Sequence, residues 1–89
     1  MIQRQATIQN QLGLHARAAA KLTKLASSFA CEVWMSRHGR RINAKSIMGV
    51  LMLAAGQGAT VEIECDGPDE EQAMQALLAL IDDKFGEGA

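Results

Sequence analysis

The sequence has few aromatic residues: two Phe, one Trp and no Tyr among 89 residues. Proteins that bind single-stranded nucleic acid stack the bases on aromatic side chains, and other binders carry a recognisable basic helix, so nucleic acid is a disfavoured partner. Long apolar runs are also absent, and the N-terminal residues Met1-Ile2-Gln3-Arg4-Gln5 lack the apolar region of a signal peptide. We therefore expect a cytoplasmic chain that is not embedded in a membrane.

Cysteine and histidine are equally scarce. Cys31 and Cys65 match neither a disulfide framework nor a zinc motif, and His15 and His38 are the only histidines. A metal site would lack ligands, so we expect no metal. Both cysteines lie in segments of alternating polarity and are interpreted as small core residues. A chain this short has no room for a large cofactor cavity beside its core, so no cofactor is expected.

The charges are nearly balanced in number but separated along the sequence. The formal net charge is −1, yet residues 1–45 carry eight Lys and Arg against Glu32 alone, a formal +7. Residues 46–89 carry nine acids against Lys84 alone, a formal −8. Such asymmetry indicates an electrostatic binding face, which could meet nucleic acid, anionic lipid or an acidic protein.

The hydropathy pattern predicts four strands and three helices. Strands are expected where apolar and polar residues alternate, at residues 2–8, 31–36, 40–43 and 60–66. Helices are expected where apolar residues recur every three or four positions, at residues 16–28, at residues 47–53 and from Pro68 to a stop at Gly86. Strands with one apolar face are typical of antiparallel sheets. We predict an α+β fold in one domain, residues 1–89: a two-layer open-faced sandwich with three helices on one face of a four-stranded antiparallel sheet.

Further features of this pattern predict which residues are buried. The core stripe of the last helix comprises Met74, Leu77, Leu78, Ile81 and Phe85. The four residues from Gly86 onward are expected to fray. Trp34 falls on the sheet face away from the core, and Arg40 and Arg41 are expected to lie in solvent on an edge strand.

The strongest candidate site is Gly13-Leu14-His15-Ala16-Arg17. His15 stands at the entry to the first predicted helix, where backbone N–H groups are free and the helix dipole is positive. Arg17 adds a permanent positive charge in the same turn, and no acid is near it in sequence. A helix start with an imidazole and an unpaired guanidinium is an anion site with its own nucleophile.

Phosphoryl transfer to the imidazole is the chemistry that suits this arrangement. Neutral His is a competent nucleophile near pH 7. Helix amides contribute about 0.3–2 kcal/mol toward an anion, and a charge-assisted bond from Arg17 adds about 1.5–3 kcal/mol. Their sum is enough to position a phosphoryl group and small enough to release it. A Ser or Cys triad is not favoured, because no recognised pattern supplies one.

Two motifs resemble a known family. The residues Gly13-Leu14-His15-Ala16-Arg17-Ala18-Ala19 and Asn43-Ala44-Lys45-Ser46-Ile47-Met48-Gly49-Val50-Leu51 are similar to the two signatures of HPr, the histidine-containing phosphocarrier family of the phosphoenolpyruvate-dependent phosphotransferase system. Their spacing and the chain length also match. The resemblance implies that enzyme I phosphorylates His15 on Nδ1, that Arg17 holds the phosphoryl oxygens, and that a sugar-specific enzyme IIA takes the group.

One position departs from the family pattern, and one serine has two interpretations. Ala18 stands where the family usually has Pro, which stiffens a first helical turn, whereas Ala18 restores an N–H group. Ser46 is predicted to cap the helix at residues 47–53. The resemblance adds phosphorylation of Ser46 by an HPr kinase/phosphorylase. The negative charge of the phosphate on Ser46 is expected to slow phosphorylation of His15.

The helix at residues 47–53 is too apolar for a single buried face. Val50 and Leu53 can serve the core, which leaves Ile47, Met48, Leu51 and Met52 partly exposed. Deeper burial is one interpretation, and a docking patch is the other. Arg17, Lys24 and Lys45 would ring the patch and attract acidic partners.

We predict a phosphocarrier that acts only between partner enzymes and is not itself an enzyme. Alternatives are a carrier of the related nitrogen-regulatory branch and a non-catalytic regulator that binds through residues 47–53. Nothing in the sequence demands more than a monomer.

Overall fold

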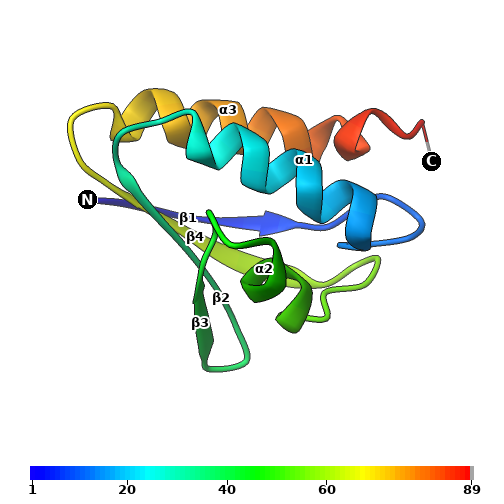
Figure 1. The fold of residues 1–89 in the computed structure, drawn as a ribbon. Coiled ribbons are helices and arrows are strands. Elements are labelled where there is room, and N and C mark those ends of the chain that lie inside the picture. The colour runs from blue at the N-terminus through cyan, green and yellow to red at the C-terminus, as the bar shows by residue number, and fades with distance from the viewer. Residues whose placement is uncertain (89) are drawn as a thin grey trace.

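The computed structural model describes residues 1–88 (Figure 1). These residues form four antiparallel strands and three helices. The strands are β1 (Ile2–Thr7), β2 (Glu32–Arg37), β3 (Arg40–Asn43) and β4 (Thr60–Asp66), in the sheet order β1-β4-β2-β3. The helices are α1 (Ala16–Ser27), α2 (Ile47–Met52) and α3 (Glu70–Asp82), followed by a 3₁₀ turn, η1 (Lys84–Gly86). The predicted element order, the antiparallel sheet and the open-faced sandwich are confirmed.

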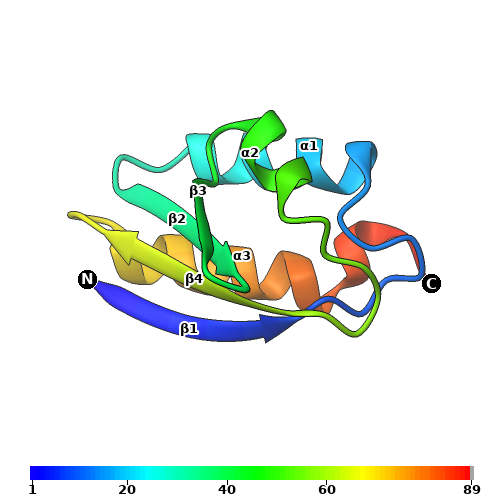
Figure 2. The ribbon, with the colours of Figure 1, turned by 90° about the horizontal axis from the view of Figure 1, so that it is seen from below.

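The helices lie on one face of the sheet and leave its other face open (Figure 2). Val61, Ile63 and Cys65 of the central strand β4 point toward the helices and are buried, while Glu62 and Glu64 alternate to the open face. On the other layer, Ala18, Ala19 and Leu22 of α1 are fully buried. Small alanine side chains let α1 approach its neighbours closely, which places its N-terminus at a fixed point beside the sheet.

The two cysteines are core residues, as predicted. Cys31 and Cys65 are both buried and unpaired. Burial raises the pKa of the Cys65 thiol to about 12, so this thiol stays protonated and unreactive at neutral pH. No helix within residues 1–88 is long and apolar enough to cross a membrane.

The β2–β3 hairpin carries an unexpected cluster on the open face. A two-residue turn with positive φ at His38 (51°) and Gly39 (79°) joins the strands, as is common in hairpins. Arg41 is exposed on the edge strand β3, as predicted, but its guanidinium also has partners that the sequence did not indicate. Its guanidinium carbon lies 4.2 Å from the ring centre of Trp34, and its Nη2 pairs with Glu64 Oε2 at 2.8 Å.

The C-terminal segment also differs from the prediction. The last helix ends at Asp82, because Lys84 and Phe85 both adopt φ of 55° in a left-handed turn. Phe85 is fully buried, as predicted, but it reaches the core from η1 and not from the helix. The expectation that the tail frays is wrong for Gly86 and Glu87: the turn carries Glu87 back over α1, where its side chain is only 14% exposed.

Candidate functional site

His15 is the N-cap residue of α1, placed there by a close-packed turn. Gly13 has φ of 68°, and a side chain at this position would come within 2.7 Å of the Ala55 carbonyl oxygen. The amide of Leu14 donates a hydrogen bond of 2.9 Å to the same carbonyl. Only glycine fits this left-handed, crowded position. The turn therefore fixes where the imidazole leaves the backbone.

The first turn of α1 offers free amide groups beside His15. The N-cap side chain makes no capping hydrogen bond, and the helix ladder begins with the amide of Ala19, which donates to the His15 carbonyl at 2.8 Å. Within residues 1–88 the amides of Ala16, Arg17 and Ala18 have no acceptor. Unpaired amides at the positive end of a helix dipole are suited to an anion. Ala18 contributes one that a proline would lack.

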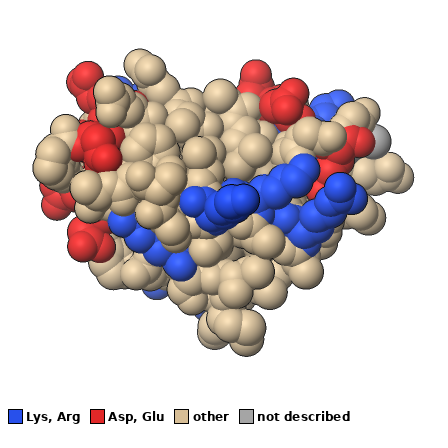
Figure 3. Space-filling view, turned by 45° about the horizontal axis from the view of Figure 1, so that its top comes forward, with Lys and Arg blue, Asp and Glu red and all other residues tan. Residues whose placement is uncertain are grey.

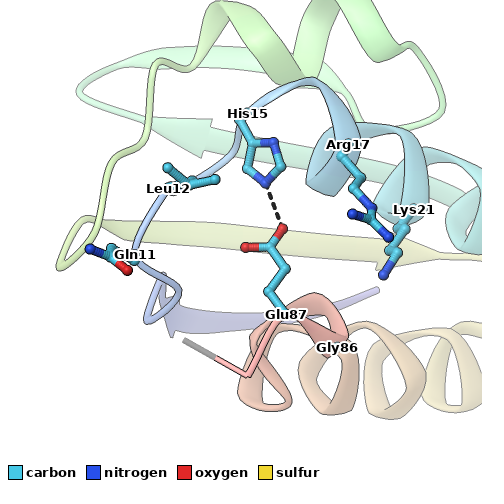
Figure 4. Close-up of a pocket in the computed structure, with 7 residues that line it drawn as sticks. All are labelled: Gln11, Leu12, His15, Arg17, Lys21, Gly86 and Glu87. Carbon is cyan, nitrogen blue, oxygen red and sulfur yellow. Dashed lines mark hydrogen bonds and ion pairs between the residues drawn. The ribbon is translucent and has the colours of Figure 1, made fainter.

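A shallow hollow of about 340 Å³ surrounds the imidazole (Figure 4). The His15 side chain is 27% exposed, so a partner can reach its ring. The hollow is lined by residues of the loop before α1, of α1 itself and of the C-terminal turn: Gln11, Leu12, His15, Arg17, Lys21, Gly86 and Glu87. No group of three His, Cys, Asp or Glu side chains in the described part of the chain is placed to hold a metal ion.

Glu87 is the site residue that sequence reasoning missed. Its Oε2 lies 2.5 Å from Nε2 of His15, and its Oε1 accepts a 3.0 Å hydrogen bond from Nδ2 of Asn10. The hydrogen bond with His15, followed by that from Asn10, lowers the pKa of the Glu87 carboxyl, which is therefore a carboxylate at neutral pH. The only signal in the sequence is that Glu87 is an acid between two glycines. Such a pattern does not reveal a contact with a residue 72 positions away.

The two cations of the hollow behave differently. Arg17 is exposed and has no ion-pair partner among residues 1–88, as its sequence surroundings predict. Figure 4 shows its side chain beside that of Lys21, across the hollow from Leu12. Lys21 instead donates a hydrogen bond of 2.6 Å from Nζ to the carbonyl of Phe85. Arg17 is thus the cation that remains free to bind an incoming anion.

Ser46 lies in a second turn, at the start of α2. Its Oγ accepts a hydrogen bond of 3.2 Å from the amide of Gly49, which confirms the predicted N-cap. The residue is exposed, so a modifying enzyme could reach its hydroxyl.

The apolar residues of α2 divide as predicted. Val50 is fully buried, Leu53 after the helix is 3% exposed, and Leu51 is half-buried. Ile47, Met48 and Met52 are 39%, 66% and 54% exposed, so deeper burial of all these side chains is wrong. Sequence reasoning missed Leu12, in the loop before α1, which is 69% exposed beside the hollow.

The basic residues expected around this apolar patch are on the surface to different extents. Lys24 is exposed on α1, whereas Nζ of Lys45 is held by the carbonyl of Phe29 at 2.8 Å. Figure 3 shows Lys and Arg side chains gathered in a band across one face, with acidic residues toward its edges. This face therefore presents a basic surface to a partner.

Comparisons with known proteins agree with this geometry. The family model described as "PTS HPr component phosphorylation site" matches residues 2–83. Phosphocarrier protein HPr of Cupriavidus necator is 67% identical over 88 residues, 99% of each chain. Phosphocarrier protein NPr of Shewanella violacea is 44% identical over 99% of this chain and 97% of its own. The crystal structure of HPr-C-His from Thermoanaerobacter tengcongensis matches with a TM-score of 0.95 and 44% identity, covering 98% of each chain.

Proposed function

Because this chain belongs to the HPr family of phosphotransferase-system phosphocarriers, we propose that it carries the phosphoryl group on His15. Phospho-enzyme I donates the group, and an enzyme IIA of the sugar phosphotransferase system accepts it. The chain itself is a carrier and not a catalyst, since the transfer needs a partner enzyme on each side. Arg17 and the free amides of the first turn of α1 hold the phosphoryl oxygens.

The observation that carries this proposal is the difference in hydrogen bonding between the two ring nitrogens of His15. Nε2 is taken by Glu87, while Nδ1 has no hydrogen-bond partner within the described residues. The side chain is part-exposed beside three amides that lack acceptors. A nitrogen lone pair next to unused anion donors is what uptake of a phosphoryl group needs. This supports Nδ1 as the acceptor atom.

The test is incubation with phosphoenolpyruvate and enzyme I. We expect one phosphate per chain, labile in acid and stable in base, as a phosphoimidazole is. His15→Ala should abolish the label, and His38→Ala, which changes the other histidine in the exposed β2–β3 turn, should keep it. A label that survives His15→Ala would refute the assignment.

The apolar residues of α2, with Leu12, are proposed as the partner-docking patch. Ile47, Met48 and Leu51 would sit in an apolar groove, while Lys24, Lys45 and Arg17 would face acidic groups at its rim. Opposite charges speed encounter, and a small apolar contact dissociates easily, as a carrier between two partners requires. Met48→Ala should raise KM for the carrier in the enzyme I reaction with little change in kcat. An unchanged KM would count against the patch.

Ser46 is proposed as a regulatory phosphorylation site for an HPr kinase/phosphorylase. It is exposed and lies at the beginning of the docking patch, so added negative charge there would repel an acidic partner. The carrier is expected to act in the cytoplasm. It is also expected to act as a monomer, since His15, Glu87 and Arg17 line one hollow within a single chain. Labelling of a sugar-specific enzyme IIA, in preference to a nitrogen-regulatory one, would assign the sugar branch.

A further inference from the structure

The segment after α3 is held in an unfavourable backbone conformation. Lys84 and Phe85 have φ of 55°, and Gly86 has φ of 74°. Residues other than glycine rarely adopt this left-handed region, and a run of three is uncommon. Such a run persists only where surrounding contacts determine it. The contacts around residues 84–87 therefore indicate what the turn is for.

Two contacts anchor the turn beside the hollow. The Phe85 ring is fully buried in the core, and the Phe85 carbonyl accepts the hydrogen bond from Nζ of Lys21. Lys21 is one helical turn beyond Arg17 on α1. The anchors thus tie the C-terminal turn to the helix that begins at His15.

The anchored turn delivers one functional group, the Glu87 carboxylate. Both of its oxygens are engaged, Oε2 with Nε2 of His15 and Oε1 with Nδ2 of Asn10. Asn10 is fully buried and also donates a 2.8 Å hydrogen bond to the Gly13 carbonyl, so it joins Glu87 to the loop that carries His15. A carboxylate fixed from both sides in this way acts on the orientation of the ring.

We propose that Glu87 is a positioning residue for phosphoryl uptake by His15. Its carboxylate accepts a hydrogen bond from Nε2–H, which holds the ring in the tautomer whose lone pair is on Nδ1. The inference rests on the proposed function and extends it to a residue that makes no contact with the phosphoryl group.

The chemical step explains why the charge of Glu87 matters. The Nδ1 lone pair forms the new N–P bond while the bond from phosphorus to the donor breaks, and that electron pair leaves with the donor. The imidazole gains positive charge as the bond forms, and Nε2 keeps its proton throughout. The carboxylate stabilises this charge without becoming protonated, as an acid paired with a catalytic imidazole does. Because Nε2 is occupied, the phosphoryl group is directed to Nδ1.

The test uses the whole chain with enzyme I and phosphoenolpyruvate. Glu87→Gln keeps the size and a hydrogen-bond acceptor but removes the charge, and Glu87→Ala removes both. Glu71→Gln is the matched control, since it loses the same charge from an exposed position at the opposite end of α3. Two quantities are measured for each variant. One is the initial rate of phosphorylation, and the other is the set of ¹⁵N chemical shifts of the His15 ring, which report the tautomer.

We expect Glu87→Gln to be phosphorylated about tenfold more slowly, the effect of one charge-assisted hydrogen bond at a part-exposed site. Glu87→Ala should be at least as slow and should also shift the ring toward the other tautomer, which a purely structural tail would not do. Glu71→Gln should match the wild type. Variants with a wild-type rate, or a wild-type tautomer in Glu87→Ala, would overturn this inference alone. A wild-type chain that takes up no phosphoryl group would instead overturn the proposed function.

Discussion

The carboxylate of Glu87 lies 2.5 Å from Nε2 of His15, although the two residues are 72 positions apart in the sequence. The contact makes the site a product of both ends of the chain. One end supplies the proposed nucleophile and its free amides, and the other supplies the carboxylate that we propose orients the ring. A carrier must give up its phosphoryl group as readily as it takes it. A ring held in one orientation lowers the entropy cost of reaching the reactive geometry for both transfers.

Gly13 is the residue on which the position of His15 depends most. Gly13→Ala should lower the free energy of unfolding by about 2–5 kcal/mol, since it adds left-handed strain to a clash with the Ala55 carbonyl. Gly39→Ala is the control: its φ of 79° is similarly left-handed, but nothing lies within 4 Å of the added carbon. That variant should lose only about 1–2 kcal/mol. Denaturant unfolding of both variants checks this, and equal losses would refute the role of crowding.

Arg17 is expected to matter for transfer and not for stability. It is exposed and pairs with no acid within residues 1–88, so Arg17→Ala should change the unfolding free energy by less than about 0.5 kcal/mol. The rate of phosphoryl uptake should fall about tenfold or more, because a charge-assisted bond to the phosphoryl oxygens is lost. Arg17→Lys keeps the charge without the planar fork and should recover part of the rate. A normal rate in Arg17→Ala would contradict the assignment.

The sequence was sufficient to predict the parts of the site that depend on local pattern. Alternation and helical spacing determine the strands and helices, and Gly13 and Ser46 mark where two helices begin, so His15 could be placed at a helix start. The HPr family was identified from two motifs because they are short and continuous in sequence, and the comparisons confirm it.

Contacts that depend on long-range geometry could not be predicted in this way. Glu87 reaches His15 only because Lys84 and Phe85 turn left-handed, and neither residue type signals that conformation. The stacking of Arg41 on Trp34 depends on the strand register, which pairs Arg41 with Ser36 and so makes Trp34 its diagonal neighbour across the hairpin. Both missed contacts therefore come from tertiary packing that overrides local preference.

Ser46 allows the effect of charge to be separated from the effect of capping. Ser46→Ala removes the acceptor for the Gly49 amide and should cost about 1 kcal/mol of stability, with little effect on phosphorylation of His15. Ser46→Asp keeps a capping oxygen but adds a negative charge, so it should retain stability and slow the enzyme I reaction. Thermal unfolding and initial rates distinguish the two. Equal rates for wild type and Ser46→Asp would count against regulation at this position.

Ala18 tests the difference between this chain and the usual family pattern. Its amide has no acceptor within the described residues, so Ala18→Pro breaks no hydrogen bond. Restricting the unfolded chain should then raise the unfolding free energy by about 0.4–1 kcal/mol. The measurement is denaturant unfolding at equilibrium. A loss of stability would show that this fully buried position has no space for the proline ring.

Asp69 is expected to control part of the acid stability of the fold. Its Oδ2 and Oδ1 accept hydrogen bonds from the amides of Ala30 (2.8 Å) and Cys31 (2.9 Å). The Ala30 bond is the main cause that lowers the Asp69 pKa below its ordinary value of 3.8. Because the folded pKa is the lower one, the stabilisation is complete above the ordinary value. It is lost as the pH falls through the folded value.

Asp69→Asn should therefore be less stable than the wild type at neutral pH, because an amide has one acceptor oxygen in place of two. The difference should shrink as the pH falls, since the wild-type carboxylate becomes protonated while the amide does not change. The pKa values of Glu70 and Glu87 are also lowered, so protonation of these two carboxyls in acid destabilises the fold. That loss of stability is shared by the wild type and Asp69→Asn. Asp82→Asn removes the same charge from an exposed position on α3 and is the control, whose stability at neutral pH should stay within about 0.5 kcal/mol of the wild type. Denaturant unfolding at a series of pH values checks this, and a gap equally wide at about pH 7 and about pH 2 would contradict the role of the carboxylate.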